Sequence, residues 1–343
     1  MPKGIGSLLP PPQAGGTGIL ETWRDGRPYQ MFRTARAALA VWLTQRKVTR
    51  VWLPAYICPA VADAVQASGA SLVWYPTDSR LHACTQTLSA ALSGDAVLCV
   101  HYFGRGIDPA LRTLAAQRPD LLWIEDRAQA MYTQGPAFGD ALLYSPRKLF
   151  GVGDGGLMAT TEACPPLSAP TDDGPDDGPN DWQANDARAA DPQGLTPERW
   201  FPAFQAREAD MDCAPRPASA RTLQCLSQLE WHTEAEARRR NWRLLSARLS
   251  DMALWPEADI DFVPLAYPIV VDEAPALQAD LARAQIWCAR HWASLPAPKH
   301  YGDAHDLSQR CLSLPLDGRY GAEDMQRIAE TIRLIRDRQG KSR

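Results

Sequence analysis

Two side chains of opposite charge follow separate apolar runs in the middle of the chain. The run 121–124 ends in an acidic pair that includes Asp126, and the run 141–144 is followed by Ser145 and then by Lys148. A glycine-rich turn and a third apolar run come next. A lysine amine can form a Schiff base with an aldehyde, and a buried carboxylate can keep a pyridine nitrogen protonated. The pair therefore indicates chemistry on a pyridine aldehyde such as pyridoxal phosphate.

A second interpretation uses the same stretch differently. Ser145 and Lys148 form a Ser-x-x-Lys motif, in which Ser145 would be the nucleophile of a serine acyl enzyme. That motif normally opens a helix, whereas Lys148 is expected between a strand and a glycine-rich turn. The order of elements therefore favours the pairing of Lys148 with Asp126.

The elements that must position these residues alternate between strand and helix. Strands are predicted at 48–53, 71–75, 96–103 and 121–124, with helices between them. This alternation predicts an α/β sheet that is largely parallel, in which ligands gather at the carboxyl ends of the strands. The candidates at or just beyond predicted strand ends are Tyr56, His101, Tyr102, Asp126 and Lys148.

A helix with apolar residues at helical spacing is predicted to begin after Thr34, which is a plausible N-cap. Free backbone N–H groups at Ala35 and Arg36 would suit a phosphate. An ordinary capped amphipathic helix explains the same residues, so this stretch alone does not decide.

The composition divides the chain into three parts. Residues 1–27 are rich in glycine and proline and are predicted to be an arm, either free or wrapped around a neighbouring subunit. Residues 28–200 form the large α/β domain and residues 201–343 a smaller α+β domain. Within the large domain, the acidic segment 165–193 is predicted to be a loop.

The second half has a different pattern. One long helix is predicted over 218–249 and a strand over 260–271.

The aspartates of the acidic segment 165–193 are not spaced as in an EF-hand, so no metal site is predicted there.

Composition limits the class of protein. The net charge of −4 argues against a broad basic surface for nucleic acid. No apolar run approaches the ~20 residues that span a bilayer. The eight cysteines form no C-x-x-C pairs, so neither a zinc framework nor a disulfide scaffold is predicted. The N-terminus lacks the layout of a signal peptide, and a cytoplasmic protein is expected.

The order of motifs resembles the DegT/DnrJ/StrS family of pyridoxal phosphate aminotransferases, over residues 30–160 and faintly beyond. The matching pieces are Thr34-Ala-Arg-Ala-Ala-Leu, Leu53-Pro-Ala-Tyr-Ile-Cys-Pro, Val100-His-Tyr-Phe-Gly, Ile124-Glu-Asp-Arg-Ala-Gln-Ala, Tyr144-Ser-Pro-Arg-Lys and Asp154-Gly-Gly. The resemblance implies fold type I, with a mixed, mainly parallel seven-stranded sheet flanked by helices and a smaller C-terminal domain. It also implies a homodimer with active sites at the subunit boundary.

Residue roles follow from the matched motifs. Asp126 would pair with the pyridine nitrogen, and Lys148 would form the Schiff base. Gln129 would lie by the ring's hydroxyl side, and Tyr56 is the candidate for the aromatic residue that faces the ring. Thr34, Ala35, Arg36 and Ser145 are predicted to hold the phosphate, and His101 and Tyr102 to contact substrate.

The chain departs from the family pattern in two places. The family often has a serine a few residues before the lysine; counting back, Leu143 occupies that place and Ser145 is shifted by two. The family's Gly-x-Asn-x-Arg segment, given by the partner subunit, has no clear copy. By offset its arginine falls on Arg216, but its asparagine falls on Ala214.

The function predicted from the sequence is transfer of an amino group from an amino-acid donor, such as glutamate, to a keto substrate that includes keto sugars. Two alternatives stay open. One is a non-catalytic fold type I protein that keeps the cofactor as a structural or regulatory element. The other is a cofactor-dependent elimination or racemisation.

Overall fold

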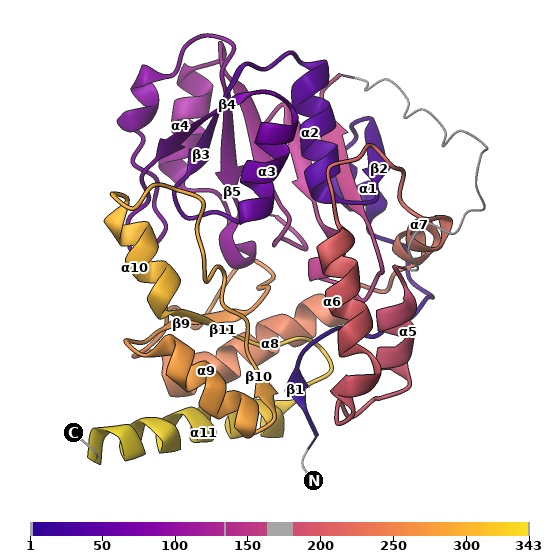
Figure 1. Cartoon of the computed structure of the whole chain (residues 1–343), viewed down its shortest axis with the longest axis vertical. Helices are drawn as coiled ribbons and strands as arrows, with labels where there is room; N and C mark the ends of the chain where they lie inside the picture. The colour runs from indigo at the N-terminus through magenta and orange to yellow at the C-terminus, as the bar shows by residue number, and fades with distance from the viewer. Residues whose placement is uncertain (1–2, 134, 163–180, 342–343) are drawn as a thin grey trace.

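The computed structural model describes residues 3–133, 135–162 and 181–341. A large sheet lies at one end of the molecule, and a smaller group of helices and short strands lies at the other (Figure 1). The predicted boundary near residue 200 stays a prediction.

A seven-stranded sheet forms the large part of the molecule. Across the sheet the strands are β2 (Tyr29–Phe32), β8 (Gly156–Thr160), β7 (Ala141–Tyr144), β6 (Leu122–Asp126), β5 (Ala96–Val100), β3 (Arg50–Pro54) and β4 (Ser71–Tyr75). Only β8 runs antiparallel to its neighbours, β2 and β7. The predicted mixed, mainly parallel sheet of seven strands is therefore confirmed, although the sequence did not indicate β2.

The central strands are apolar on both faces because helices cover both. Val51 and Leu53 belong to a core cluster with helices α2 (Ala35–Gln45) and α3 (Pro59–Ala67). Trp52, between them, faces the opposite cluster with Trp123 and helix α4 (Pro109–Gln117). This doubly covered arrangement explains the near-continuous apolar runs in the sequence.

The N-terminal arm packs on its own chain, which neither alternative for residues 1–27 predicted. Strand β1 (Ile5–Gly6) pairs in parallel with β10 (Ile286–Trp287). Helix α1 (Leu20–Arg24) places Trp23 on Tyr144, with the two rings stacked 4.6 Å apart. The Trp23 indole N–H also donates to the Met131 carbonyl. Trp23 thus covers the outer face of β7 from within the same subunit.

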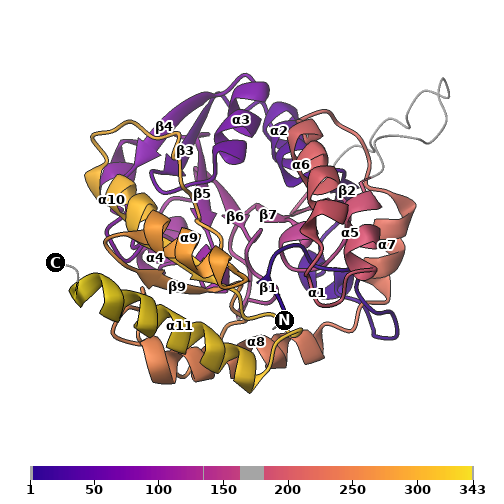
Figure 2. The same ribbon diagram turned by 60° about the horizontal axis from the view of Figure 1, so that its bottom comes forward.

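The C-terminal part contains a two-stranded antiparallel sheet and helices. The strands are β9 (Tyr267–Val270) and β11 (Cys311–Leu314), and the helices are α8 (His232–Leu249), α9 (Ala274–Arg283), α10 (Gly302–Arg310) and α11 (Ala322–Lys341). Helices α8 and α11 lie side by side on the outer side of this part (Figure 2). Mixed strands and helices agree with the predicted α+β character.

Two predictions about the second half were wrong in detail. The helix predicted over 218–249 is broken into α7 (Ala220–Ser227) and α8. It breaks because the Gln228 carbonyl accepts hydrogen bonds from Gly15 and Gly16 of the arm. The strand predicted over 260–271 is confined to β9.

The predicted acidic loop contains a helix, α5 (Gln183–Ala189), and helix α6 (Phe201–Asp210) follows it. The sequence did not indicate these two helices because they lack a clear apolar stripe. Polar side chains join them instead: the Arg207 guanidinium donates to the Asn185 side-chain carbonyl at 2.6 Å. Residues 163–180 of that loop lie outside the described residues. Within the described chain no group of three metal-ligating side chains occurs, and no helix is long and apolar enough to cross a membrane.

Candidate active site

Asp126 and Lys148 meet at one edge of the sheet. Strands β6 and β7 are parallel, with Asp126 opposite Leu143, so the residues that follow both strands emerge on the same side. Asp126 ends β6, and Lys148 lies in the 3₁₀ turn Pro146–Lys148 directly after β7. The positive charge of Lys148 acts on the Asp126 carboxyl, although no ion pair within 4.0 Å joins them in the described chain. The central juxtaposition predicted from the sequence is therefore present.

Asp126 is a buried carboxylate with little compensation. Its side chain is 6% exposed, and Oδ1 accepts one hydrogen bond, from the Ala128 N–H at 2.9 Å. Burial raises the pKa of Asp126, and the charge of Lys148 opposes that rise without cancelling it. A cation placed beside this carboxylate would remove the cost of burying it.

Lys148 projects into a half-buried space shared with the C-terminal part. Its Nζ lies 6.0 Å from the centre of the Trp292 ring and makes no hydrogen bond within the described residues. The neighbouring His291 has Nδ1 2.8 Å from the Ser313 hydroxyl. Burial, with a contribution from the charge of Lys148, lowers the pKa of His291 to about 3, so this imidazole is neutral at physiological pH. Sequence reasoning missed both residues.

The start of helix α2 offers backbone donors near the same turn. Thr34 is the N-cap, and its hydroxyl accepts from the Ala37 N–H at 3.0 Å. The Arg36 N–H carries no hydrogen bond within the described chain, as expected in a first helical turn, while the backbone at Thr34 bridges in parallel to Gly155 of the glycine-rich turn. The Arg36 guanidinium is turned to the Met211 carbonyl, at 2.9 Å. The Arg36 N–H therefore fits a phosphate better than the Arg36 side chain does.

Two glycines bring the Lys148 turn against the start of α2. A Cβ on Gly156 would lie 2.2 Å from the Ala35 nitrogen, and a Cβ on Gly155 would lie 2.8 Å from Pro146 Cγ. Gly155 also has φ +123°, which other residues rarely adopt. The glycine-rich turn after Lys148 therefore lets the Lys148 turn pack closely against the start of α2.

Gln129 connects the site to the turn after β5. Its side-chain carbonyl accepts from the Phe103 N–H at 2.6 Å, while its Nε2 is buried without a partner. Phe103 has φ +53°, a costly conformation for a residue other than glycine. The hydrogen bonds from Phe103 to Gln129 and from the Leu265 N–H to the Phe103 carbonyl hold that conformation. The unpartnered Nε2 is free to donate to a ligand.

His101 lies on the other face of the sheet from Asp126. Successive residues of a strand point to opposite faces, so Glu125 and Asp126 diverge. The buried His101 places Nε2 3.0 Å from Glu125, and its Nδ1 has no partner. The structure does not bring His101 beside Lys148, and its predicted contact with substrate stays a prediction.

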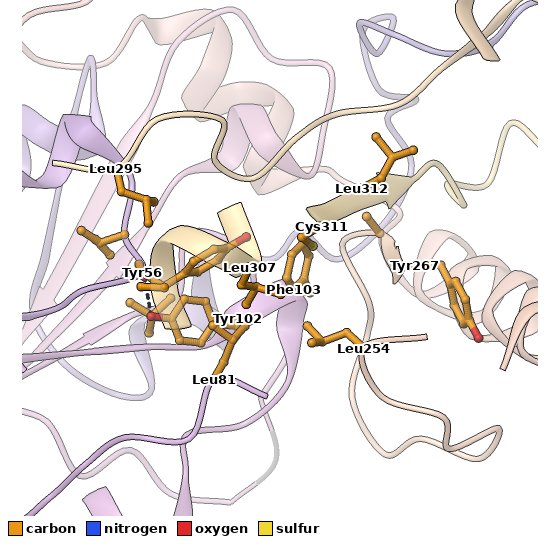
Figure 3. Close-up of a cluster of buried hydrophobic side chains, with 14 of the residues drawn as sticks. Tyr56, Leu81, Tyr102, Phe103, Leu254, Tyr267, Leu295, Leu307, Cys311 and Leu312 are labelled. Atoms are coloured by element: carbon orange, nitrogen blue, oxygen red, sulfur yellow. Dashed lines mark hydrogen bonds between the residues drawn. The ribbon is translucent and has the colours of Figure 1, made fainter. Parts of the chain in front are cut away.

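Tyr56 and Tyr102 lie together inside the core (Figure 3). The Tyr102 hydroxyl donates to the Tyr56 carbonyl at 2.5 Å, and the Tyr56 side chain is fully buried. The Tyr56 ring is 5.4 Å from the Trp292 ring. The Trp292 ring therefore lies near both the Tyr56 ring and the Lys148 amine. Its predicted role beside the cofactor ring and the substrate role of Tyr102 stay predictions.

The remaining predicted residues differ in their setting. Ser145 is buried directly after β7, and its carbonyl accepts from the Lys148 N–H at 3.1 Å. Leu143, which occupies the family's serine position by counting, lies within β7 in the core. Arg216 is half exposed and pairs with Asp212 of its own chain at 2.6 Å. The predicted phosphate contacts of Ser145 and Arg216 stay predictions.

A separate cavity of about 390 Å³ lies beyond this site. Its lining includes Tyr102, Gly104, Arg105 and Trp255, but neither Asp126 nor Lys148. This cavity is therefore distinct from the space between the carboxylate and the lysine.

Comparison with known proteins bears on the family resemblance. Residues 33–164 match the model of the DegT/DnrJ/EryC1/StrS aminotransferase family. The chain resembles this family across the segment that holds Asp126 and Lys148. The resemblance inferred from the motifs is therefore confirmed there.

A curated protein is similar to part of the chain. It is the UDP-N-acetyl-3-dehydro-alpha-D-glucosamine 3-aminotransferase of Acidithiobacillus ferrooxidans, 36% identical over 125 residues. The match covers 33% of this chain and 34% of that protein, so the chain spans about a third of the relative's length.

Solved structures extend the likeness to the whole fold. A putative sugar aminotransferase, Spr1654 from Streptococcus pneumoniae in its PLP form, has a TM-score of 0.69 and 15% identity. The alignment covers 98% of this chain and 99% of that one. A DegT DnrJ EryC1 StrS aminotransferase from Brucella abortus has a TM-score of 0.62 and 22% identity, covering 90% and 85% of the two chains. These likenesses confirm the fold type I architecture.

Proposed function

We propose that the protein is a pyridoxal phosphate-dependent aminotransferase. The observation that carries the proposal is the buried Asp126, which lacks a cationic partner within 4.0 Å in the described chain and faces the same space as Lys148. A pyridinium ring supplies the missing positive charge, and an aldehyde on that ring finds a free amine at Lys148.

The residues at the site fit the cofactor group by group. Asp126 would hold the proton at the ring nitrogen, and the Gln129 Nε2, buried without a partner, would donate to a ring oxygen. The N–H groups of Ala35 and Arg36 would bind the phosphate at the start of α2, with Thr34 shaping the helix end. Trp292 would border the space in front of Lys148.

When bound, the cofactor accepts the amino group of a donor and withdraws electrons from the carbon that loses its proton. Lys148 would attach the cofactor through Nζ and, once released, move that proton as general base. His291 is neutral beside it, so it adds no second positive charge. Asp126 would keep the ring nitrogen protonated.

The proposed substrates are an amino-acid donor, such as glutamate, and a keto acceptor of the sugar class. Two observations support the acceptor class: the curated relative is named for a dehydro sugar nucleotide, and the similar solved structures include sugar aminotransferases.

We further propose a cytoplasmic homodimer. The seven cysteines within the described residues are all free thiols, which suits a reducing compartment. Sedimentation analysis of the purified protein should give twice the mass of one chain; a monomeric result at micromolar concentration would contradict the dimer.

Absorbance spectroscopy tests the function. Purified protein mixed with the cofactor should gain a visible absorbance band, and Lys148→Ala should lose it and reduce transamination by at least ~10²–10⁴-fold. Lys299→Ala, an exposed lysine, serves as the matched control and should behave as wild type. Glutamate should bleach the wild-type band and a keto sugar should restore it. A protein that never gains the band disproves cofactor binding, and a band unchanged by any amino donor favours a non-catalytic role.

A further inference from the structure

A second cavity, of about 360 Å³, lies where the arm, the end of α5 and the turn before α11 meet. Its principal lining residues are Lys3, Pro10, Arg188, Pro192, Arg319 and Tyr320, here called the arginine pocket. Lys3 pairs with Asp324 of α11 at 2.9 Å, which joins the arm to that helix. The pocket shares no residue with the Lys148 site.

Among the described residues, the wall of the pocket carries three cations, Lys3, Arg188 and Arg319, and no carboxylate. Arg319 is paired with Asp317 at 2.6 Å, and Lys3 with Asp324. Neither acid is among the described lining residues. The cavity therefore presents positive groups to any molecule that enters it.

Arg188 is the unusual member of the pocket. Its side chain is 2% exposed, and no ion pair involves it within the described chain. Nη1 donates to the Asp191 carbonyl, while Nε is buried without a partner. The Asp191 carboxylate accepts instead from the N–H groups of Leu195 and Thr196 and from the Trp200 indole.

The fold holds Arg188 firmly in this setting. Its guanidinium lies 5.8 Å from the Trp200 ring centre, and a Cβ on Gly194 would come within 3.1 Å of Nη2. Burial lowers the pKa of Arg188, and repulsion by Arg319 lowers it further. An unpaired buried charge is costly, and a bound anion offsets that cost.

We propose that the arginine pocket binds the phosphate group of a small molecule, either inorganic phosphate or a phosphate monoester. Guanidinium groups match the oxygens of phosphate with paired N–H donors, and three cations suit a dianion. The cavity is larger than a phosphate, which leaves room for the rest of an ester. This site is independent of the proposed transamination.

Thermal unfolding tests the proposal on the full chain saturated with pyridoxal phosphate, so that the start of α2 is already filled. Phosphate is titrated against chloride at constant ionic strength and pH. The Tm should rise with the logarithm of phosphate concentration, as for any ligand of the folded state. Glycerol 1-phosphate should act similarly or more strongly, and the dicarboxylate succinate should have little effect.

Variants localise the effect. Arg188→Gln should weaken phosphate binding by about tenfold or more, and Lys3→Ala, at the exposed edge, by a few-fold. Arg283→Gln, an exposed arginine on α9, is the control and should keep the wild-type response. If Arg188→Gln does not fold, the Lys3→Ala result and calorimetric titration of phosphate into wild type still decide. Three results would overturn the site. They are no rise of the Tm in wild type, a rise in both Lys3→Ala and Arg188→Gln that equals the wild-type rise, or a rise with succinate that equals the rise with phosphate.

Discussion

The two faces of strand β6 bury neighbouring carboxylates in opposite ways. Glu125 is fully buried and accepts hydrogen bonds from His101, Arg127 and the N–H groups of Phe138 and Gly139. Asp126, one residue later, accepts a single hydrogen bond within the described residues, from the Ala128 N–H. Glu125 is satisfied by its own chain, whereas Asp126 has far fewer partners among the described residues, as the proposed cofactor site requires.

The electrostatics follow the contacts. Burial favours the neutral acid at both positions. At Glu125 the hydrogen bond from His101 and the charge of Arg127 outweigh burial and hold the pKa well below its usual value. At Asp126 burial prevails and the pKa is raised. An unsatisfied buried charge therefore marks the candidate site better than burial or cavity size does.

The same contrast separates two arginines. Arg33 is buried but forms ion pairs with Asp181 and Asp210, each at 2.7 Å. Arg188 is equally buried and has no ion pair within the described chain. The comparison along β6 thus supports a ligand at the arginine pocket on the same physical ground.

Removal of the Glu125 carboxylate gives the largest expected effect, and Asp126→Asn is its counterpart on the other face of β6. Glu125→Ala leaves Arg127 buried without its carboxylate and should lower the free energy of unfolding by about 3–5 kcal/mol. Asp126→Asn should leave the stability of the cofactor-free protein unchanged or higher, because it removes a destabilised charge. Urea unfolding of cofactor-free protein measures both. Equal losses in the two variants would break the comparison.

The pH dependence of stability should have opposite signs at the two carboxylates. The pKa of Glu125 is depressed below 4.5, so its stabilisation is present above pH 4.5 and is lost as the pH falls. The pKa of Asp126 is raised above 3.8, so the cofactor-free protein loses stability as the pH rises from 3.8 through the raised value.

Urea midpoints from pH 2 to 7 check these signs. Asp126→Asn should remove the loss of stability that occurs as the pH rises from 3.8. Glu125→Ala should flatten the loss of stability that occurs as the pH falls below 4.5. A wild-type profile that Asp126→Asn does not change would show that the Asp126 carboxyl is satisfied after all.

Gln129 tests a group with one satisfied and one open end. Gln129→Leu leaves the Phe103 N–H buried without an acceptor and should cost about 1–3 kcal/mol. Gln326→Leu, on the exposed side of α11, is the control and should stay within ~0.5 kcal/mol of wild type. Urea unfolding measures the difference, and a loss no larger than the control's would remove the structural role of Gln129.

Thr34 gives the smallest expected effect. Thr34→Ala removes the N-cap of α2 and should cost about 0.5–2 kcal/mol, whereas Thr34→Ser keeps the hydroxyl and should cost a few tenths. Thermal unfolding of cofactor-free protein distinguishes them. If alanine and serine were equivalent, the hydrogen bond from the Ala37 N–H would not stabilise the helix start.

Much of the site could be predicted because its signals are local. Asp126 ends an apolar strand, and Lys148 stands between a strand and a glycine-rich turn. The helix start at Thr34 has its own capping residue. The wrong predictions concern segments whose contacts are distant: the arm, which packs on Tyr144 and on residues 285–287, and α5, whose helix rests on buried polar contacts.

The sequence alone determined which carboxylate and which lysine could act together, since strand ends and turns are written in neighbouring residues. Only the tertiary structure decided what surrounds them. His291 and Trp292 reach Lys148 from more than a hundred residues away, and Arg188 meets Lys3 and Arg319 from opposite ends of the chain. The periodic pattern of a sequence does not predict such long-range contacts, because they depend on how whole elements pack. Whether a buried charge is satisfied is likewise a property of the folded chain.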